Sequence, residues 1–226
     1  HRGLRVSELG GLFRSLNMVA SAAKITLSRH YFRNMNKEMK FATKAIHAGV
    51  EPDAATGAIM TPIYQTSTYA QPTPGEHKGY EYSRTQNPTR HALEKNLAAL
   101  ENGKHGLAFA SGLASIDACM RLLNPGEEVI STNDLYGGTY RLYTKVHENY
   151  GLNFHFIGMD TPQHAEQYIT EKTKMIWIET PTNPTMNIID IKGFAELAKR
   201  HNILLVVDNT FASPYLQNPL DLGADI

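Results

Sequence analysis

The sequence of 226 residues lacks the features that mark several classes of protein. It has one cysteine, Cys119, which excludes an internal disulfide and fits a reducing compartment. No apolar run approaches the roughly 20 residues that a membrane-spanning helix needs, so no membrane partner is predicted. Lysine and arginine (22) balance aspartate and glutamate (22), which gives no basic excess for nucleic acid. The ten histidines form neither an HExxH motif nor a cluster with cysteine, so no metal site is predicted.

The apolar fraction of 42% is ordinary for a soluble globular protein, but the first 40 residues differ from the rest. They are rich in arginine and serine and contain two acids. One interpretation is that they form a disordered or upstream-translated extension of a cytoplasmic protein. The real start of the protein would then lie near Met35 or Met39. The alternative is a transit peptide that directs the protein to an organelle. Under both interpretations residues 1–40 are excluded from the fold.

Residues 41–87 are predicted to form an extended amino-terminal arm. Proline and glycine recur through the segment and prevent any long helix or strand. The segment is nevertheless too rich in apolar and aromatic side chains to be left in water. We therefore expect the arm to lie on another surface, either of its own domain or of a partner subunit. The apolar and aromatic residues are Ile59, Ile63, Tyr64, Tyr69, Tyr80 and Tyr82.

Residues 88–226 show an alternation of apolar strands and amphipathic helices. Asn87 is a good helix N-cap and Pro88 suits the first helical position. Such alternation predicts an α/β domain with a doubly wound, mainly parallel sheet and helices on both faces. The expected strands are 106–110, 128–131, 153–157, 174–179 and 203–208, and a further strand begins at residue 223. The expected helices are 88–101, 113–123, 139–150, 162–170 and 191–201.

The last complete strand of this series ends in an acid. Five apolar residues, 203–207, run directly into Asp208. In open α/β sheets, ligands bind at the carboxyl ends of the strands. A carboxylate partly withdrawn from water there needs a cationic or hydrogen-bonding partner. That partner is either the ring nitrogen of a cofactor or, as a purely structural alternative, a helix start or a buried hydrogen bond of the chain itself.

Three other strand ends carry residues suited to ligand binding. A helix begins at Ser111, Gly112 and Leu113. The free N–H groups of its first turn and the serine hydroxyl can bind an anion, and the alternative is that the serine only caps the helix. Tyr136 can stack on a flat heteroaromatic ring beside two glycines, or can pack over a turn. Asn183 lies in a loop that two prolines restrict, and it either presents its amide to a ligand or belongs to a structural turn.

The arm and the helix after Tyr136 add three candidates. If residues 80–84 are extended, Tyr82 and Arg84 point the same way, and a phenol beside a guanidinium suits a phosphate dianion. The alternative is an amphipathic edge strand. Arg141, near a helix start, is in most proteins a solvated charge.

Together the strand ends match a flat, phosphorylated, pyridine-type cofactor. Residues 111–113 would hold the phosphate, Tyr136 would cover the ring, Asn183 would lie near the phenolic oxygen, and Asp208 would pair with the ring nitrogen. A dinucleotide site would require GxGxxG after the first strand, and this motif is absent. A nucleotide-binding module that uses the Ser111 loop is the remaining alternative.

Residues 41–226 resemble the amino-terminal half of the Cys/Met metabolism family of pyridoxal-phosphate enzymes. This is the transsulfuration group, which includes cystathionine γ-synthase, cystathionine γ-lyase, cystathionine β-lyase and methionine γ-lyase. The stretches that carry the resemblance are 43–49, 62–68, 82–89, 109–114, 134–139, 179–184 and 207–211.

The resemblance implies the large domain of a fold-type I enzyme, pyridoxal 5′-phosphate as cofactor and small sulfur amino acids as substrates. It implies that Tyr82 and Arg84 reach the cofactor phosphate of a neighbouring subunit in a dimer or tetramer. Residues 111–113 correspond to the phosphate loop, and Asp208 to the partner of the ring nitrogen. Tyr136 corresponds to a stacking tyrosine that assists proton transfer, and Arg141 to a substrate-side arginine.

The sequence departs from the family pattern at its end. The Schiff-base lysine of the family lies in a Ser-Ala-Thr-Lys segment, and no lysine up to Ile226 matches it. We therefore expect a truncated cofactor-binding domain that binds the cofactor weakly and is inactive alone. Elimination or replacement at the γ-carbon, as in cystathionine γ-synthase or γ-lyase, is the favoured reaction. The alternatives are the methionine γ-lyase or cystathionine β-lyase branch, or a non-catalytic product.

Overall fold

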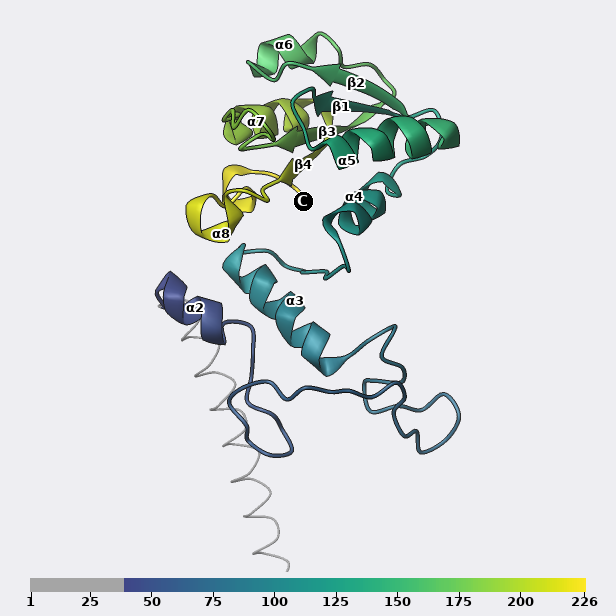
Figure 1. Cartoon of the computed structure of the whole chain (residues 1–226), viewed down its shortest axis with the longest axis vertical. Helices are drawn as coiled ribbons and strands as arrows, with labels where there is room; N and C mark the ends of the chain where they lie inside the picture. Colours follow the sequence, from purple (N-terminus) through teal and green to yellow (C-terminus); the bar gives the residue numbers. More distant parts are fainter. Residues whose placement is uncertain (1–38) are drawn as a thin grey trace, which may run out of the picture.

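A computed structural model describes residues 39–226, and a parallel sheet lies in its carboxyl-terminal part, at the top of Figure 1. All but the last two residues of the segment 1–40 fall outside the described residues. The strands are β1 (Glu128–Thr132), β2 (Asn153–Ile157), β3 (Thr173–Glu179) and β4 (Leu204–Asp208). The α-helices are α2 (Phe41–His47), α3 (Pro88–Leu100), α4 (Gly112–Met120), α5 (Gly137–Leu142), α6 (Pro162–Glu166), α7 (Ile191–His201) and α8 (Ser213–Leu216). A π-helical turn, η1 (Tyr143–His147), and two 3₁₀ turns, η2 (Glu148–Tyr150) and η3 (Leu220–Leu222), complete the elements.

The four strands pair in the order β2-β1-β3-β4, and every pair is parallel. The chain therefore places β2 on one side of β1 and then crosses to the other side of β1, where β3 and β4 follow. This change of direction between β1 and β3 is a topological switch point, where the loops after the strands separate and leave room for a ligand. The doubly wound parallel sheet predicted from the sequence is confirmed.

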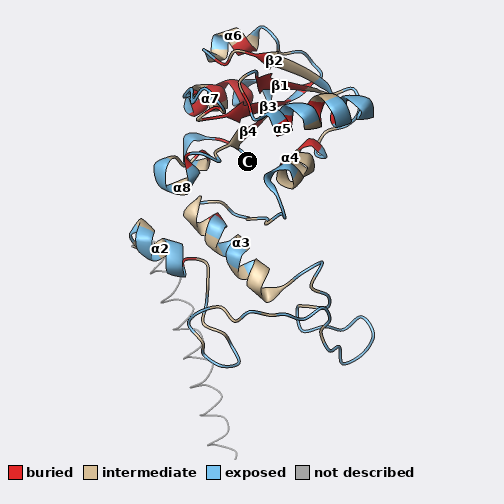
Figure 2. Ribbon diagram, in the orientation of Figure 1, coloured by how far each residue is buried: buried red, intermediate tan, exposed pale blue. Residues whose placement is uncertain are grey.

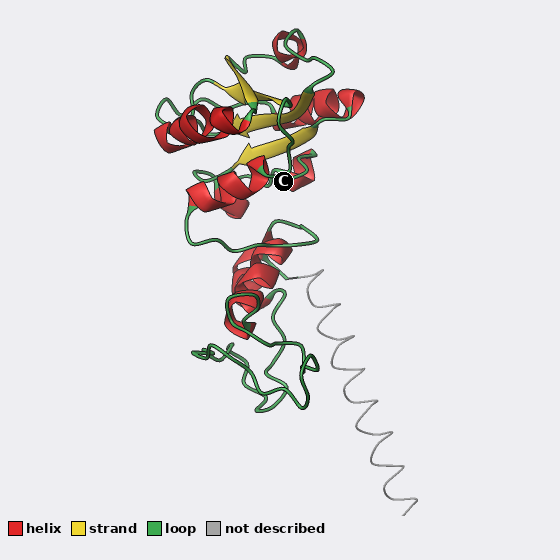
Figure 3. Ribbon diagram, turned by 90° about the vertical axis from the view of Figure 1, so that its right-hand side faces the viewer, coloured by secondary structure: helices red, strands yellow, loops and turns green. Residues whose placement is uncertain are grey.

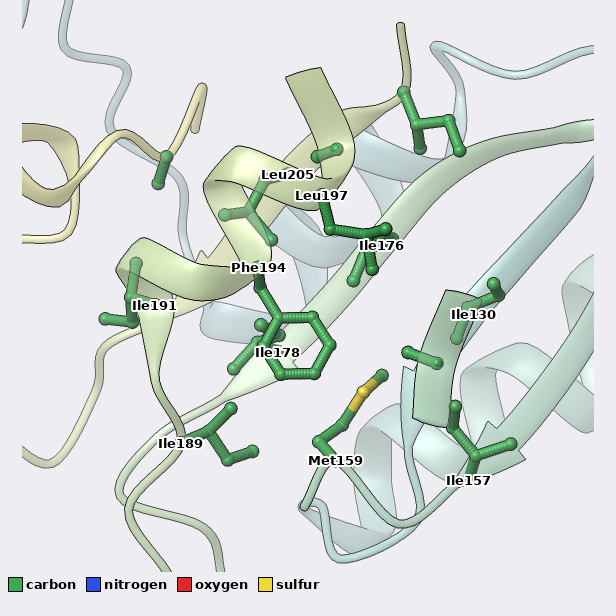
Figure 4. Packing of buried hydrophobic residues seen from close by; sticks show 14 residues of the cluster. Ile130, Ile157, Met159, Ile176, Ile178, Ile189, Ile191, Phe194, Leu197 and Leu205 are labelled. Carbon is green, nitrogen blue, oxygen red and sulfur yellow. The ribbon is translucent and has the colours of Figure 1, made fainter. Parts of the chain in front are cut away.

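One face of the sheet is covered by α7 and α6. Ile176 and Ile178 of β3 and Leu205 of β4 meet Phe194 and Leu197 of α7, and all five side chains are fully buried (Figure 4). The apolar residues of α7 recur every three or four positions, so they share one face of the helix. Burial is concentrated in this layer and decreases toward the arm, which is mostly exposed (Figure 2).

The opposite face of the sheet packs against α4, α5 and η1. Tyr143 of η1 is fully buried, stacks on Phe154 of β2 with ring centroids 4.4 Å apart, and meets Trp177 of β3 edge-on. Cys119 of α4 joins this cluster, and burial raises the pKa of its thiol. Helices thus lie on both faces, as predicted.

The arm and α3 lie to one side of the sheet (Figure 3), and the end of α3 contacts the segment that follows β4. Asn102, just after α3, donates a hydrogen bond of 2.9 Å to Asp221, and Asn218 donates to the carbonyl oxygen of Leu100. The Asn87 side chain accepts from the N–H of Thr89, so the predicted N-cap of α3 is confirmed.

Two predicted strands are not observed, and two predicted helices are shorter than expected. Residues 106–110 are not a strand, because the segment has no pairing strand within residues 39–226, and Leu107 stays 74% exposed. The helices expected to reach residues 123 and 170 end at Met120 and Glu166. Residues 223–226 are not assigned as a strand, although Asp225 donates to the Leu205 carbonyl oxygen of β4.

Two further expectations concern absent features. None of the helices described in the structure has the length and apolar character needed to cross a membrane. Within residues 39–226, no three histidine, cysteine, aspartate or glutamate side chains gather in a way that could hold a metal ion.

Candidate functional site

A cavity of about 370 Å³ lies at the carboxyl edge of the sheet, beside the switch point. Its walls come from the start of α4, the loop after β1, and the ends of β3 and β4 with their following loops. Six residues singled out from the sequence line it together, although they are up to 97 positions apart. The lining residues are Ser111, Gly112, Leu113, Ile116, Tyr136, Glu179, Pro181, Asn183, Asp208, Thr210 and Phe211.

The start of α4 lines the cavity with three residues. Ser111 is the N-cap, and its hydroxyl oxygen accepts from the N–H of Ala114 at 3.2 Å, so its capping role is real. The first N–H groups of a helix have no acceptor within that helix, and those of Gly112 and Leu113 belong to this first turn. A β-carbon built on Gly112 would meet no atom within 4 Å, so the space beside these N–H groups is open. The arrangement suits an anion.

Tyr136 is another lining residue of the cavity. The side chain is 46% exposed, which leaves ring surface available to a ligand. Gly138 permits this placement, since a β-carbon there would lie 2.3 Å from Cε1 of Tyr136 and 2.8 Å from Cζ. Gly137 differs, because its β-carbon would meet only a terminal atom of Arg141, at 3.7 Å. The Tyr136 ring thus lies directly against Gly138, so it packs over its own turn, which is the alternative that the sequence left open.

Gly138→Ala is therefore expected to displace the Tyr136 ring, whereas Gly137→Ala is expected to leave it in place. A methyl group at residue 138 would lie within 3 Å of the ring, which must then turn away. Because the ring is 46% exposed, this movement should cost little stability. The ring resonances of Tyr136, identified by their loss in Tyr136→Phe, measure the displacement. Equal shifts of these resonances in the two glycine variants would show that the ring does not lie against Gly138.

The loop after β3 is held in place by Asp134. The Asp134 carboxylate accepts hydrogen bonds from the hydroxyls of Thr182 and Thr185 and from the Asn187 amide at 3.3 Å. The bonds from Thr182 and then Thr185 lower the pKa of Asp134. Because the two threonines flank Asn183, this network fixes the segment that brings Asn183 to the cavity.

Asp208 ends β4 at the cavity wall and is partly buried. Its Oδ1 accepts from the N–H of Thr210 at 3.1 Å and from the Thr210 hydroxyl. The structural alternative considered for this acid is therefore present as a local turn. Both bonds engage Oδ1, which leaves Oδ2 for a donor in the cavity.

Glu179 is a wall residue that the sequence interpretation named only as the end of a strand. It is 4% exposed, and its Oε2 accepts from the N–H of Tyr136 at 2.9 Å. In the β3–β4 register Glu179 pairs with Asp208. Burial, with the nearby charges of Asp208 and Asp134, raises the pKa of Glu179 to about 7, against the N–H groups of Tyr136 and Asn183, which act to lower it. The sequence did contain one signal for Glu179, because Glu179, like Asp208, is an acid at the end of an apolar strand.

Three predicted residues do not line this cavity. Tyr82 and Arg84 lie on the arm, where Tyr82 makes a single bridge with Thr68 and Arg84 is part of a turn rather than of an extended strand. The Arg84 guanidinium lies 5.1 Å from the centre of the Tyr82 ring. Arg141 is exposed on α5. A single chain does not test a role for Tyr82 and Arg84 in a neighbouring subunit, and the roles of all three stay predictions.

The lining of the cavity thus combines the first N–H groups of a helix, a carboxylate and an aromatic ring. These groups suit a ligand that has a phosphate, a flat ring and a protonated ring nitrogen. The volume lies within the range of about 300–1,000 Å³ that is usual for small-molecule sites.

Comparisons with known proteins agree with this geometry. Residues 42–226 match the family model described as Cys/Met metabolism PLP-dependent enzyme. The chain is 52% identical over 194 residues to a cystathionine β-lyase of Coxiella burnetii, covering 85% of this chain and 50% of that protein. It is 54% identical over 186 residues to a probable cystathionine γ-synthase of Herpetosiphon aurantiacus, covering 82% of this chain and 58% of that protein.

A solved structure shows the same fold. The crystal structure of metB from Corynebacterium glutamicum superposes with a TM-score of 0.81 at 49% identity, covering 84% of this chain and 50% of that one. The chain spans about half the length of the curated relatives it matches. With the family model matched over nearly all of the described residues, the chain belongs to the family of Cys/Met metabolism PLP-dependent enzymes.

Proposed function

We propose that the chain forms the cofactor-binding part of a pyridoxal-phosphate-dependent transsulfuration enzyme that acts on small sulfur amino acids. The observation that carries the proposal is the convergence of Ser111, Tyr136, Asn183 and Asp208 on one cavity. Relatives named cystathionine β-lyase, γ-synthase and γ-lyase, at 50–54% identity, support the transsulfuration group. Within that group we propose elimination or replacement at the γ-carbon of the substrate.

The residues of the cavity fit pyridoxal phosphate by their chemistry. The α4 start provides N–H donors for a phosphate group, with open space beside Gly112. Oδ2 of Asp208 can accept a hydrogen bond from a protonated ring nitrogen, as only Oδ1 is engaged by Thr210. The exposed ring of Tyr136 can cover a flat heteroaromatic face. Asn183 also lines the cavity, and its amide can donate or accept a hydrogen bond there.

Each residue then has a defined task. When bound, pyridoxal phosphate supplies an electron sink for the electron pair left when a bond to the substrate α-carbon breaks. Asp208 holds a proton on the ring nitrogen, which keeps this sink effective. Tyr136 orients the ring and assists proton transfer at the substrate, and Asn183 orients the ring from its phenolic oxygen. Arg141 is proposed to lie on the substrate side.

We also propose that the arm contacts a second subunit, which would bring Tyr82 and Arg84 to the neighbouring cofactor phosphate. The arm keeps Ile59, Met60 and Ile63 60%, 69% and 78% exposed, an unfavourable state for apolar side chains in water. Sedimentation analysis tests this, and a chain that stays monomeric at high concentration would contradict it. A cytoplasmic location stays a prediction.

A binding titration separates this proposal from the nucleotide-binding alternative. Pyridoxine 5′-phosphate is the suitable probe, because it carries the ring, the phenolic oxygen and the phosphate but no aldehyde, so its binding requires no lysine. We expect it to bind the chain and to be displaced by pyridoxal 5′-phosphate but not by adenosine monophosphate. Displacement by the nucleotide alone would overturn the proposal.

A further inference from the structure

Glu179 and Asp208 are adjacent carboxyl groups on neighbouring parallel strands. They are register partners at the ends of β3 and β4, and each follows a buried residue two positions earlier, Trp177 and Val206, on the sheet face that packs against η1. Side chains two positions apart on a strand point to the same face, so the two carboxyl groups lie side by side on the cavity face. Paired strands are roughly 5 Å apart, a distance at which two negative charges repel strongly in a buried setting.

The two acids differ in their surroundings. Glu179 is almost fully buried and is engaged by the Tyr136 N–H, whereas Asp208 is partly open and engages Thr210. The groups that act on Glu179 come from every neighbouring segment. Asp208 on β4 and Asp134 after β1 are negative, and the N–H groups of Tyr136 and Asn183 are donors. The fully buried Tyr143 of η1 also lies within electrostatic reach of both acids.

We propose that Glu179 is a positioning residue that holds the single proton of the Glu179–Asp208 pair and at the same time anchors the backbone of Tyr136. This inference rests on the proposed function, because it assigns Glu179 a task toward the same cavity. A neutral Glu179 leaves the negative charge of the pair on Asp208, at the cavity. Through the hydrogen bond to the Tyr136 N–H, the same side chain also sets the position of the ring that covers the ligand.

Burial and the neighbouring acids support this assignment by raising the pKa of Glu179 from 4.5 to about 7. The folded chain then binds this proton more tightly than the unfolded chain. The stability that Glu179 contributes is accordingly full below pH 4.5 and falls as the pH rises toward 7, because only the unfolded state gives up the proton freely in that interval. Glu179→Gln mimics the neutral acid, so this decrease in stability with rising pH should be absent from the variant.

The test uses the chain without any ligand, so its failure leaves the proposed cofactor binding untouched. In a chain labelled with ¹³C at the glutamate carboxyl carbons, the resonance missing from Glu179→Gln is expected to titrate with a midpoint of about 7. Asp208→Asn, which removes the neighbouring charge, is expected to lower that midpoint. A midpoint in the ordinary range of glutamate, or one that Asp208→Asn leaves unchanged, would overturn the shared proton.

Two further measurements cover the anchoring role and the possibility that a variant folds poorly. The Tyr136 amide should exchange with solvent at least about tenfold faster in Glu179→Leu, but at an almost unchanged rate in Glu179→Gln, whose side-chain oxygen still accepts its hydrogen bond. The unfolding constant of Glu179→Gln relative to the original chain should fall at least about tenfold between mildly acidic and mildly alkaline pH. Equal exchange in both variants, or a ratio independent of pH, would contradict the proposal.

Discussion

Replacing Phe194 with alanine is expected to destabilise the chain by about 3–5 kcal/mol. Phe194 projects from α7 into the centre of the larger core cluster and is fully buried (Figure 4). Loss of the ring removes its transfer free energy and leaves a cavity between α7 and the sheet, which close-packed neighbours fill only partly. Because α7 connects β3 to β4, the loss also loosens the two strands that carry Glu179 and Asp208.

Urea denaturation followed by circular dichroism measures this effect, and Phe109→Ala is the matched control. Phe109 is 46% exposed and lies in a segment without regular structure, so its removal is expected to change the free energy of unfolding by less than about 1 kcal/mol. Similar losses in the two variants would mean that the sheet and α7 are not packed as described.

Asp208→Asn is expected to weaken the binding of pyridoxine 5′-phosphate by about tenfold to a hundredfold, with little change in fold. A hydrogen bond between a carboxylate and a protonated ring nitrogen contributes on the order of 1.5–3 kcal/mol, and each 1.4 kcal/mol is a factor of ten in affinity. Asparagine keeps an oxygen that can accept from Thr210, so the local turn survives while the negative charge is lost.

Fluorescence titration of the original chain and the variant gives the ratio of dissociation constants. Asp160→Asn is the control, as Asp160 is exposed and does not line the cavity. Equal affinities for the original chain and Asp208→Asn would show that the charge of Asp208 does not contribute to binding. A loss of similar size in Asp160→Asn would show that the effect comes from net charge and not from a contact.

The sequence predicted the interior of the fold well because hydrophobic periodicity reports which side chains are buried. The strand at 153–157 and the helix at 191–201 were placed with their observed bounds. The segment 106–110 was misjudged for a physical reason. A strand exists only through its pairing, and the sequence of one segment does not show whether a partner is beside it. The π turn at 143–147, which buries both Tyr143 and His147, also had no local signal.

The site was predictable to the extent that the carboxyl ends of parallel strands meet at one edge. From that rule we predicted that one site contains Ser111, Tyr136, Asn183 and Asp208. It did not identify Glu179 as a site residue, because its significance depends on register and on the Tyr136 N–H, and neither is visible before the strands are paired. The roles of Tyr82, Arg84 and Arg141 depend on groups beyond a single chain or on the substrate, so they stay predictions.

The protonation state of a bound pyridine ring tests the central claim most directly. With pyridoxine 5′-phosphate labelled with ¹⁵N in the ring, the nitrogen resonance distinguishes the protonated from the free ring. At mildly alkaline pH we expect the ring nitrogen to carry a proton when bound to the original chain, because the Asp208 carboxylate stabilises the cation. In Asp208→Asn the bound ring should be unprotonated. A ring nitrogen that is unprotonated in the original chain, or protonated equally in both, would contradict the account.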